Sequence, residues 1–124
     1  MENELLTQLN QWHKDDEYDK IIATIRAIPT INWDYDLSGQ LARAHNNKGD
    51  YDKAIEILMT ISEKGQEDPL WHFRVGYAYF YKDMPFNALP FFEKSAALGD
   101  ETAIEFSDFC KRELRYKNSS PPIR

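Results

Sequence analysis

The sequence contains a single cysteine, Cys110, among its 124 residues. A disulfide within the chain is therefore excluded, as is typical of proteins in the reducing cytoplasm. Basic residues are also scarce, since 15 lysines and arginines face 21 aspartates and glutamates, a net charge of −6. Because duplex DNA is bound through a basic surface, this balance argues against general nucleic-acid binding.

Long apolar runs are absent as well. No stretch approaches the ~20 residues that a membrane-spanning helix needs. Residues 1–6 are acidic and lack the basic start and apolar run of a secretory signal. No segment alternates apolar and polar residues with a period of two, so no strand is predicted. Together these features predict a cytoplasmic protein without a membrane span.

Apolar residues make up 42% of the chain and aromatic residues 14%, which is too much for a disordered protein. They recur every three or four positions, and this period predicts helices. A chain of this length holds one core, so a single domain is expected. The predicted helices cover residues 2–13, 18–28, 35–45, 51–63, 70–81, 86–98 and 101–116.

Aspartates stand just before several of these helices, where a side-chain oxygen can accept a free backbone N–H. Asp15 or Asp16 is predicted to cap the second helix, Asp34 the third and Asp50 the fourth. Gly49 suits the left-handed residue that ends a helix.

The stretch from Trp71 to Leu98 predicts two short helices joined by a tight turn. Small and aromatic residues recur along it at helical spacing, namely Val75, Gly76, Tyr79, Ala88, Phe92 and Ala96. This order resembles one tetratricopeptide repeat (TPR), a helix pair with Leu-Gly, Tyr, Ala, Phe and Ala at these places. His72 departs from the family pattern, which prefers Trp there.

The same pattern occurs 34 residues earlier, where Leu41-Ala42 matches Val75-Gly76 and Ala54 matches Ala88. A weaker copy relates residues 17–21 to residues 50–54, with an offset of 33. Small residues at these places let paired helices approach closely, and larger ones would force them apart. About three repeats are needed for independent stability, so three copies form a plausible domain.

The resemblance implies an all-α fold, a right-handed superhelix of three TPR-like helix pairs followed by a C-terminal capping helix. The pairs would cover residues 2–29, 34–65 and 69–99, and the capping helix residues 101–116. One domain would then span residues 1–117, with a flexible tail at 118–124. The alternative is an unrelated helical bundle.

In TPR proteins the first helix of each pair lines a concave groove. On that resemblance, partner-binding positions fall at Asn10, His13, Arg43, Asn46, Phe73, Tyr77, Phe80 and Tyr81. Arg74 and Asn10 also match two places of the clamp with which some TPR proteins grip the terminal carboxylates of chaperone tails. Leu6, Gln40 and Leu70 replace its Lys, Asn and Lys, so the clamp is incomplete.

Residues 70–81 are apolar nearly all round. Phe73, Tyr77 and Phe80 follow spacings of four and three, so they share one helical face. The opposite face is predicted to pack against partner helices through Trp71, Val75, Ala78 and Tyr79. A helix that is apolar on two faces is buried on both or binds something. The alternatives are that the final helix or a second copy covers the aromatic face.

No catalytic or metal-binding pattern is present in the sequence. The acids at positions 15, 16, 17 and 19 lack the glycine and the spacing of a calcium loop. His13, His45 and His72 have no second ligand one turn away, which argues against zinc. Cys110 lies on the apolar stripe of the last helix and is expected to be an inert thiol. We therefore predict no enzyme activity, no metal and no cofactor.

The sequence thus predicts a cytoplasmic protein-interaction module, a scaffold that holds a peptide or protein segment in a groove. The aromatic residues would supply apolar contacts, and Arg43, Asn10 and Asn46 would hold polar or acidic groups. The first alternative is a structural homo-oligomer that uses the same aromatic face as a self-interface. A second is a small helical enzyme or RNA-binding protein, with Arg43 and Arg74 stacking on bases. The net charge argues against RNA binding.

Overall fold

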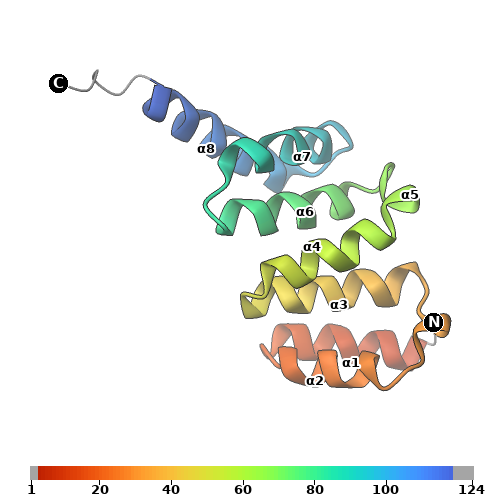
Figure 1. Cartoon of the computed structure of the whole chain (residues 1–124). Coiled ribbons are helices and arrows are strands. Elements are labelled where there is room, and N and C mark those ends of the chain that lie inside the picture. The colour runs from red at the N-terminus through yellow and green to blue at the C-terminus, as the bar shows by residue number, and fades with distance from the viewer. Residues whose placement is uncertain (1–2, 119–124) are drawn as a thin grey trace. The chain divides into compact units, whose positions relative to one another are not determined.

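The computed structural model describes residues 3–118, and every regular element in that range is helical (Figure 1). The predicted all-α class is therefore confirmed. Residues 119–124, most of the predicted tail, lie outside the described residues. The helices are α1 (Asn3–Lys14), α2 (Tyr18–Arg26), the 3₁₀ helix η1 (Thr30–Asn32), α3 (Tyr35–Lys48), α4 (Tyr51–Thr60), α5 (Ser62–Gly65), α6 (Pro69–Tyr81), α7 (Pro85–Ala97) and α8 (Glu101–Asn118).

The chain divides into two compact units, one ending at Lys64 and the other beginning at Gly65. In the first unit, α2 packs against α1 and α3, and α3 packs against α4 (Figure 1). In the second unit, α7 packs against both α6 and α8. The single domain over residues 1–117 and the superhelix remain predictions.

Aspartate side chains cap α3 and α6, and the cap at Asp34 is the one predicted above. The Asp34 carboxylate accepts the backbone N–H of Leu37 at 2.8 Å, and Asp68 accepts that of Leu70 at 2.9 Å. Each of these bonds satisfies one of the free donors at a helix N-terminus. Gly49 ends α3 in the left-handed conformation, with φ of 95°, as its sequence position predicted.

Two predicted caps are wrong. Asp16 has φ of 58°, and its carboxylate accepts the hydroxyl of Tyr18 at 2.7 Å, so the N-cap position of α2 falls on Glu17. Asp50 occupies the N-cap position of α4 without a side-chain capping bond. Its Oδ2 lies 3.4 Å from Nδ1 of His45 instead. Asp16 thus lies one residue before the cap position, whereas at Asp50 the His45 ring contacts the carboxylate that a cap would use.

The core of the first unit is aliphatic. Trp33 closes its edge, because the indole Nε1–H is shared between the carbonyl oxygens of Ile25, at 3.1 Å, and Ile28, at 2.9 Å. Ile25 lies in the last turn of α2 and Ile28 two residues beyond its end, so neither carbonyl accepts the regular helical bond of α2. The fully buried side chains are Leu9, Ile21, Ile25, Leu41, Ala42, Ala44, Ala54 and Leu58.

The core of the second unit is aromatic and centres on Phe92, whose side chain is fully buried. Its ring centroid lies 5.6 Å from that of Phe73, 6.1 Å from Phe80 and 5.0 Å from Phe106. Gly76 allows α6 to approach this ring, since a Cβ on Gly76 would stand 2.8 Å from Cε1 of Phe92. The predicted close helix contact at Gly76 is therefore confirmed.

His72 occupies the place where the family pattern prefers Trp. Its ring is buried and stands edge-on to Trp71, with centroids 4.9 Å apart. Its Nε2–H donates to the carbonyl oxygen of Gln66 at 3.0 Å. This bond ties the residues before α6 to the helix, so the imidazole acts here as a packed structural side chain.

Cys110 is fully buried in α8, and burial, with Glu113 nearby, raises the pKa of its thiol to about 11. At pH 8 only about one thiol in a thousand would then be ionised, whereas an ordinary cysteine is roughly a quarter ionised. Since the thiolate is the reactive form, we expect iodoacetamide to label the native chain over a hundredfold more slowly than the urea-unfolded chain. Mass spectrometry measures both rates, and equal rates would contradict the inert-thiol interpretation.

None of the described helices combines the length and the apolar character needed to cross a membrane.

Candidate functional site

A groove lies in the second unit, where the end of α6 meets the middle of α8. Its volume is about 580 Å³. We call it the aromatic groove, and its lining residues are Phe80, Tyr81, Glu105, Phe106, Asp108, Phe109 and Arg112. Two of the predicted partner-binding residues, Phe80 and Tyr81, belong to it.

Aromatic rings in edge-to-face contact form the floor of the groove. The Phe80 ring stands edge-on to Phe106 and Phe109, with centroid distances of 5.4 and 5.5 Å. Phe80 also stands edge-on to Tyr81, at 5.1 Å, and Tyr81 lies 4.5 Å from Tyr77. Such edge-to-face pairs are favourable and hold each ring in one orientation. The groove is therefore a fixed surface, since each lining ring is braced by another.

The lining rings differ in exposure. Phe80 and Phe106 are half-buried against the core, whereas Tyr81 is 48% exposed and Phe109 is 43% exposed. Large apolar side chains that stay open while resting on a packed layer are typical of binding surfaces. Tyr81 and Phe109 are thus the lining rings most available to a partner.

Charged groups of α8 form the edge of the groove. Glu105, Asp108 and Arg112 are spaced by three and four residues, so they lie along one side of the helix. The guanidinium of Arg112 lies 5.7 Å from the centre of the Phe109 ring, a cation–π contact. The carboxylates of Glu105 and Asp108 form no hydrogen bond or ion pair with any other residue that the structure describes.

The final helix covers part of the predicted aromatic face, as one alternative from the sequence anticipated. Phe106 of α8 stands edge-on to Phe73, with centroids 5.3 Å apart, and lies against Phe80. Phe73 is therefore half-buried between α7 and α8. Tyr77 and Arg74, also on α6, are half-buried. The part of this face that stays open is the aromatic groove.

The other predicted residues belong to the first unit. Asn10 is exposed on α1, and Arg43 is half-buried on α3. His13 and Asn46 are buried, and Nε2 of His13 bonds to Oε1 of Gln40 at 2.7 Å, which joins α1 to α3. Of the four predicted residues in this unit, Asn10 and part of Arg43 are therefore accessible. A binding role for the four residues remains a prediction.

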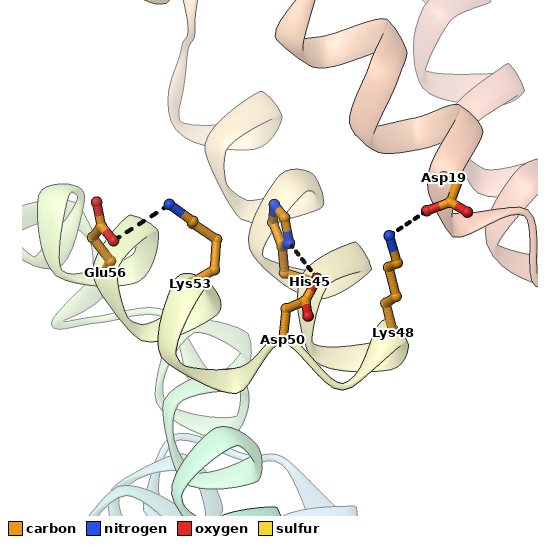
Figure 2. Close-up of polar contacts among 6 residues, drawn as sticks. All are labelled: Asp19, His45, Lys48, Asp50, Lys53 and Glu56. Carbon is orange, nitrogen blue, oxygen red and sulfur yellow. Dashed lines mark hydrogen bonds and ion pairs between the residues drawn. The ribbon is translucent and has the colours of Figure 1, made fainter.

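A polar cluster surrounds the turn between α3 and α4 (Figure 2). Lys48 of α3 pairs with Asp19 of α2 at 2.6 Å, and the Asp19 carboxylate raises the pKa of that lysine. His45, 7% exposed, contacts Asp50 across the turn at 3.4 Å. Because Nδ1–H donates to this carboxylate, the neutral ring keeps its Nε2 unprotonated in a buried position. These contacts hold the turn between α3 and α4 against α2.

Burial lowers the pKa of His45, reinforced by Arg26 and Lys53, although the bond to Asp50 opposes the shift. The folded chain therefore takes up this proton at lower pH than the unfolded chain, whose histidine has a pKa near 6.5. The stabilisation from the neutral His45 ring is complete above the pKa of the unfolded chain. It is lost as the pH falls through the lower pKa of His45 in the folded chain.

We expect the free energy of unfolding to decrease between about pH 7 and pH 5, and His45→Gln to reduce this slope. Urea titrations of both chains at several pH values measure the difference, in which the other two histidines cancel. Parallel pH profiles for the two chains would show that His45 does not carry the effect.

Within the part of the chain that the structure describes, no three His, Cys, Asp or Glu side chains are placed to hold a metal ion.

Four groove residues were missed at the level of sequence, namely Glu105, Asp108, Phe109 and Arg112. For the last helix the sequence predicted a buried stripe that includes Phe106 and Cys110, and it interpreted Glu105 and Arg112 only as charges that suit the helix dipole. The missed residues recur at spacings of three and four, so they form a second stripe beside the buried one. That stripe was visible in the sequence, but its position next to Tyr81 was not. The packing of α6 against α8 determines which residues of the two helices lie together.

Comparison with known families gives a match to part of the chain. The family model described as tetratricopeptide repeat matches residues 26–72, which include the end of α2, all of α3 and α4, and the beginning of α6. The resemblance drawn from the sequence is therefore confirmed for that segment. A search of curated proteins returned no match.

Proposed function

This chain carries a tetratricopeptide repeat segment at residues 26–72, and on that premise we propose that it is a non-enzymatic protein-interaction module. Repeats of this kind stack helix pairs and present extended surfaces that bind other proteins. We place the principal binding surface in the aromatic groove, where a peptide or protein segment would lie. The proposed compartment is the cytoplasm, on the argument that the one thiol is kept reduced.

The observation that carries this proposal is the exposure of Tyr81 and Phe109 above a packed aromatic layer. Rigid aromatic side chains supply large contact areas at low entropic cost, and they are frequent hot spots of interfaces. Phe80 and Phe106, half-buried beneath them, hold the surface in shape. A partner side chain that inserts between the two exposed rings would remove both from water.

The remaining predicted residues extend the proposed contact set. Tyr77 lies beside Tyr81 and would support it, and Arg74 lies on the same helix. In the first unit, Asn10 and the accessible part of Arg43 are proposed as a separate set of contacts. His13 and Asn46 would act there by holding their helices in place, because both are buried.

The test is a selection of random dodecapeptides, displayed on phage, against the purified full chain. We expect enriched peptides whose binding weakens at least about tenfold with Tyr81→Ala, since loss of an aromatic hot spot typically costs more than 1 kcal/mol. Leu70→Ala is the matched control, because Leu70 is 50% exposed on the same helix but does not line the groove. Absence of enrichment, or equal weakening by both variants, would contradict the proposal.

The alternative is a homo-oligomer that buries the same rings between copies, and the exposure of Tyr81 and Phe109 favours it equally. Sedimentation of the full chain separates the two functions. A monomer at micromolar concentration supports the peptide-binding module. A dimer that Phe109→Ser converts to a monomer would support the self-interface instead.

A further inference from the structure

We propose that the aromatic groove binds a basic peptide segment, one in which a large apolar side chain stands next to lysine or arginine. This inference rests on the proposed function and specifies the chemistry of its partner. It departs from the polar or acidic partner that the sequence predicted, because the charges of this groove are different.

The first argument is the charge at the groove edge. Glu105 and Asp108 are exposed, and their carboxylates pair with no described residue. One cation balances them within the lining, Arg112, and its guanidinium lies over the Phe109 ring. The groove therefore presents two available anions against one engaged cation. A cationic partner complements this balance, whereas an acidic one is repelled.

The neighbouring bases of α8 do not reverse this balance. Nζ of Lys111 lies 3.7 Å from Oε2 of Glu93 on α7, so this lysine forms an ion pair outside the groove. Lys111 and Arg115 do not line the groove. The net charge of the chain, −6, adds to the attraction at long range, since charged surfaces steer oppositely charged partners.

The second argument is the arrangement of apolar and charged groups. Glu105 and Phe109 are four residues apart on α8, so they are neighbours on its surface. A partner side chain that packs between Tyr81 and Phe109 would therefore place its adjacent residue close to the Glu105 carboxylate. Lysine and arginine suit this second place, because their apolar stems can cover the rings while their charged ends reach the acid.

The experiment repeats the dodecapeptide selection on the full chain and on a double variant, Glu105→Gln with Asp108→Asn. The control, Glu63→Gln with Glu67→Gln, removes two exposed carboxylates that do not line the groove. The quantity measured is the mean net charge of those peptides whose binding depends on Tyr81. Selected peptides are then synthesised, and their dissociation constants are measured by fluorescence anisotropy at 50 and 300 mM salt.

We expect a clear excess of lysine and arginine among the Tyr81-dependent peptides from the full chain and the control, and loss of this excess in the double variant. The double variant should weaken the synthetic peptides about fivefold, as expected for two exposed ion pairs. Raising the salt should weaken binding to the full chain more than binding to the double variant.

Three outcomes would overturn the inference. Selection of Tyr81-dependent peptides that are neutral or acidic would contradict the basic partner but leave the proposed function in place. Selection of no Tyr81-dependent peptide would contradict both the basic partner and the proposed function. A dimer that Phe109→Ser dissociates would show that a second copy occupies the groove, and would replace the basic peptide as its partner.

Discussion

Phe92→Ala is expected to lower the free energy of unfolding by about 3–5 kcal/mol, the largest effect of any single substitution considered for this chain. The Phe92 side chain is fully buried and contacts the rings of Phe73, Phe80 and Phe106 from two other helices. Its removal would leave a cavity that these anchored rings cannot readily fill. The same cavity would loosen Phe80, which supports the aromatic groove.

Phe86→Ala is the matched control, because Phe86 stands on the same helix with 76% of its side chain exposed. Its loss is expected to change the free energy of unfolding by less than about 0.5 kcal/mol. Urea unfolding followed by circular dichroism measures both variants. Similar losses of stability would mean that the core of the second unit is not centred on Phe92.

Gly76→Leu is expected to destabilise the chain by about 1–3 kcal/mol through overpacking. A Cβ at this position would stand 2.8 Å from Cε1 and 2.9 Å from Cδ1 of Phe92, closer than side chains normally approach. The added branches must then displace the Phe92 ring or separate α6 from α7. Either movement disturbs the contact around which the helix pair is built.

Ala97→Leu serves as the control for added volume, because Ala97 is exposed near the end of α7. It should change the melting temperature by no more than about 2 °C, whereas Gly76→Leu should lower it by several degrees. An unchanged melting temperature for Gly76→Leu would invalidate the repeat register that places Gly76 against Phe92.

The helices were predictable because their apolar residues recur with a regular period. The repeat register also placed Gly76 at a close helix contact, since small residues let paired helices approach. The structure identifies Phe92 as the residue that Gly76 faces. The last helix runs to Asn118, two residues beyond its predicted end. Helix ends of this kind depend on weak terminal bonds, which composition alone does not determine.

The helix caps show where local reasoning reaches its limit. Asp34 and Asp50 both precede a helix, yet only Asp34 caps its own. Asp34 has an extended backbone with ψ of −179°, whereas Asp50 has ψ of 65° and its carboxylate contacts the buried ring of His45 across the turn. A cap can be predicted from its own position, but a competing donor becomes evident only when the neighbouring helix is in place.

The candidate site was predicted only in part for a similar reason. Phe80 and Tyr81 were identified from the aromatic face of α6, and both line the groove. Phe109 and Glu105, on the opposite wall, belong to a helix that was interpreted as a cap. Which residues of α8 face Tyr81 is set by the packing of Phe106 against Phe80, a contact between residues far apart in the sequence.

The central claim is that the aromatic groove binds the partner, and the most direct test is a nuclear magnetic resonance titration. The full chain, labelled with nitrogen-15, would be titrated with the peptide that the phage selection enriches most. We predict that the largest changes in amide chemical shift occur at residues 80–82 and 105–112, on both walls of the groove. Changes confined to α1–α4, with residues 80–82 and 105–112 unaffected, would contradict the account.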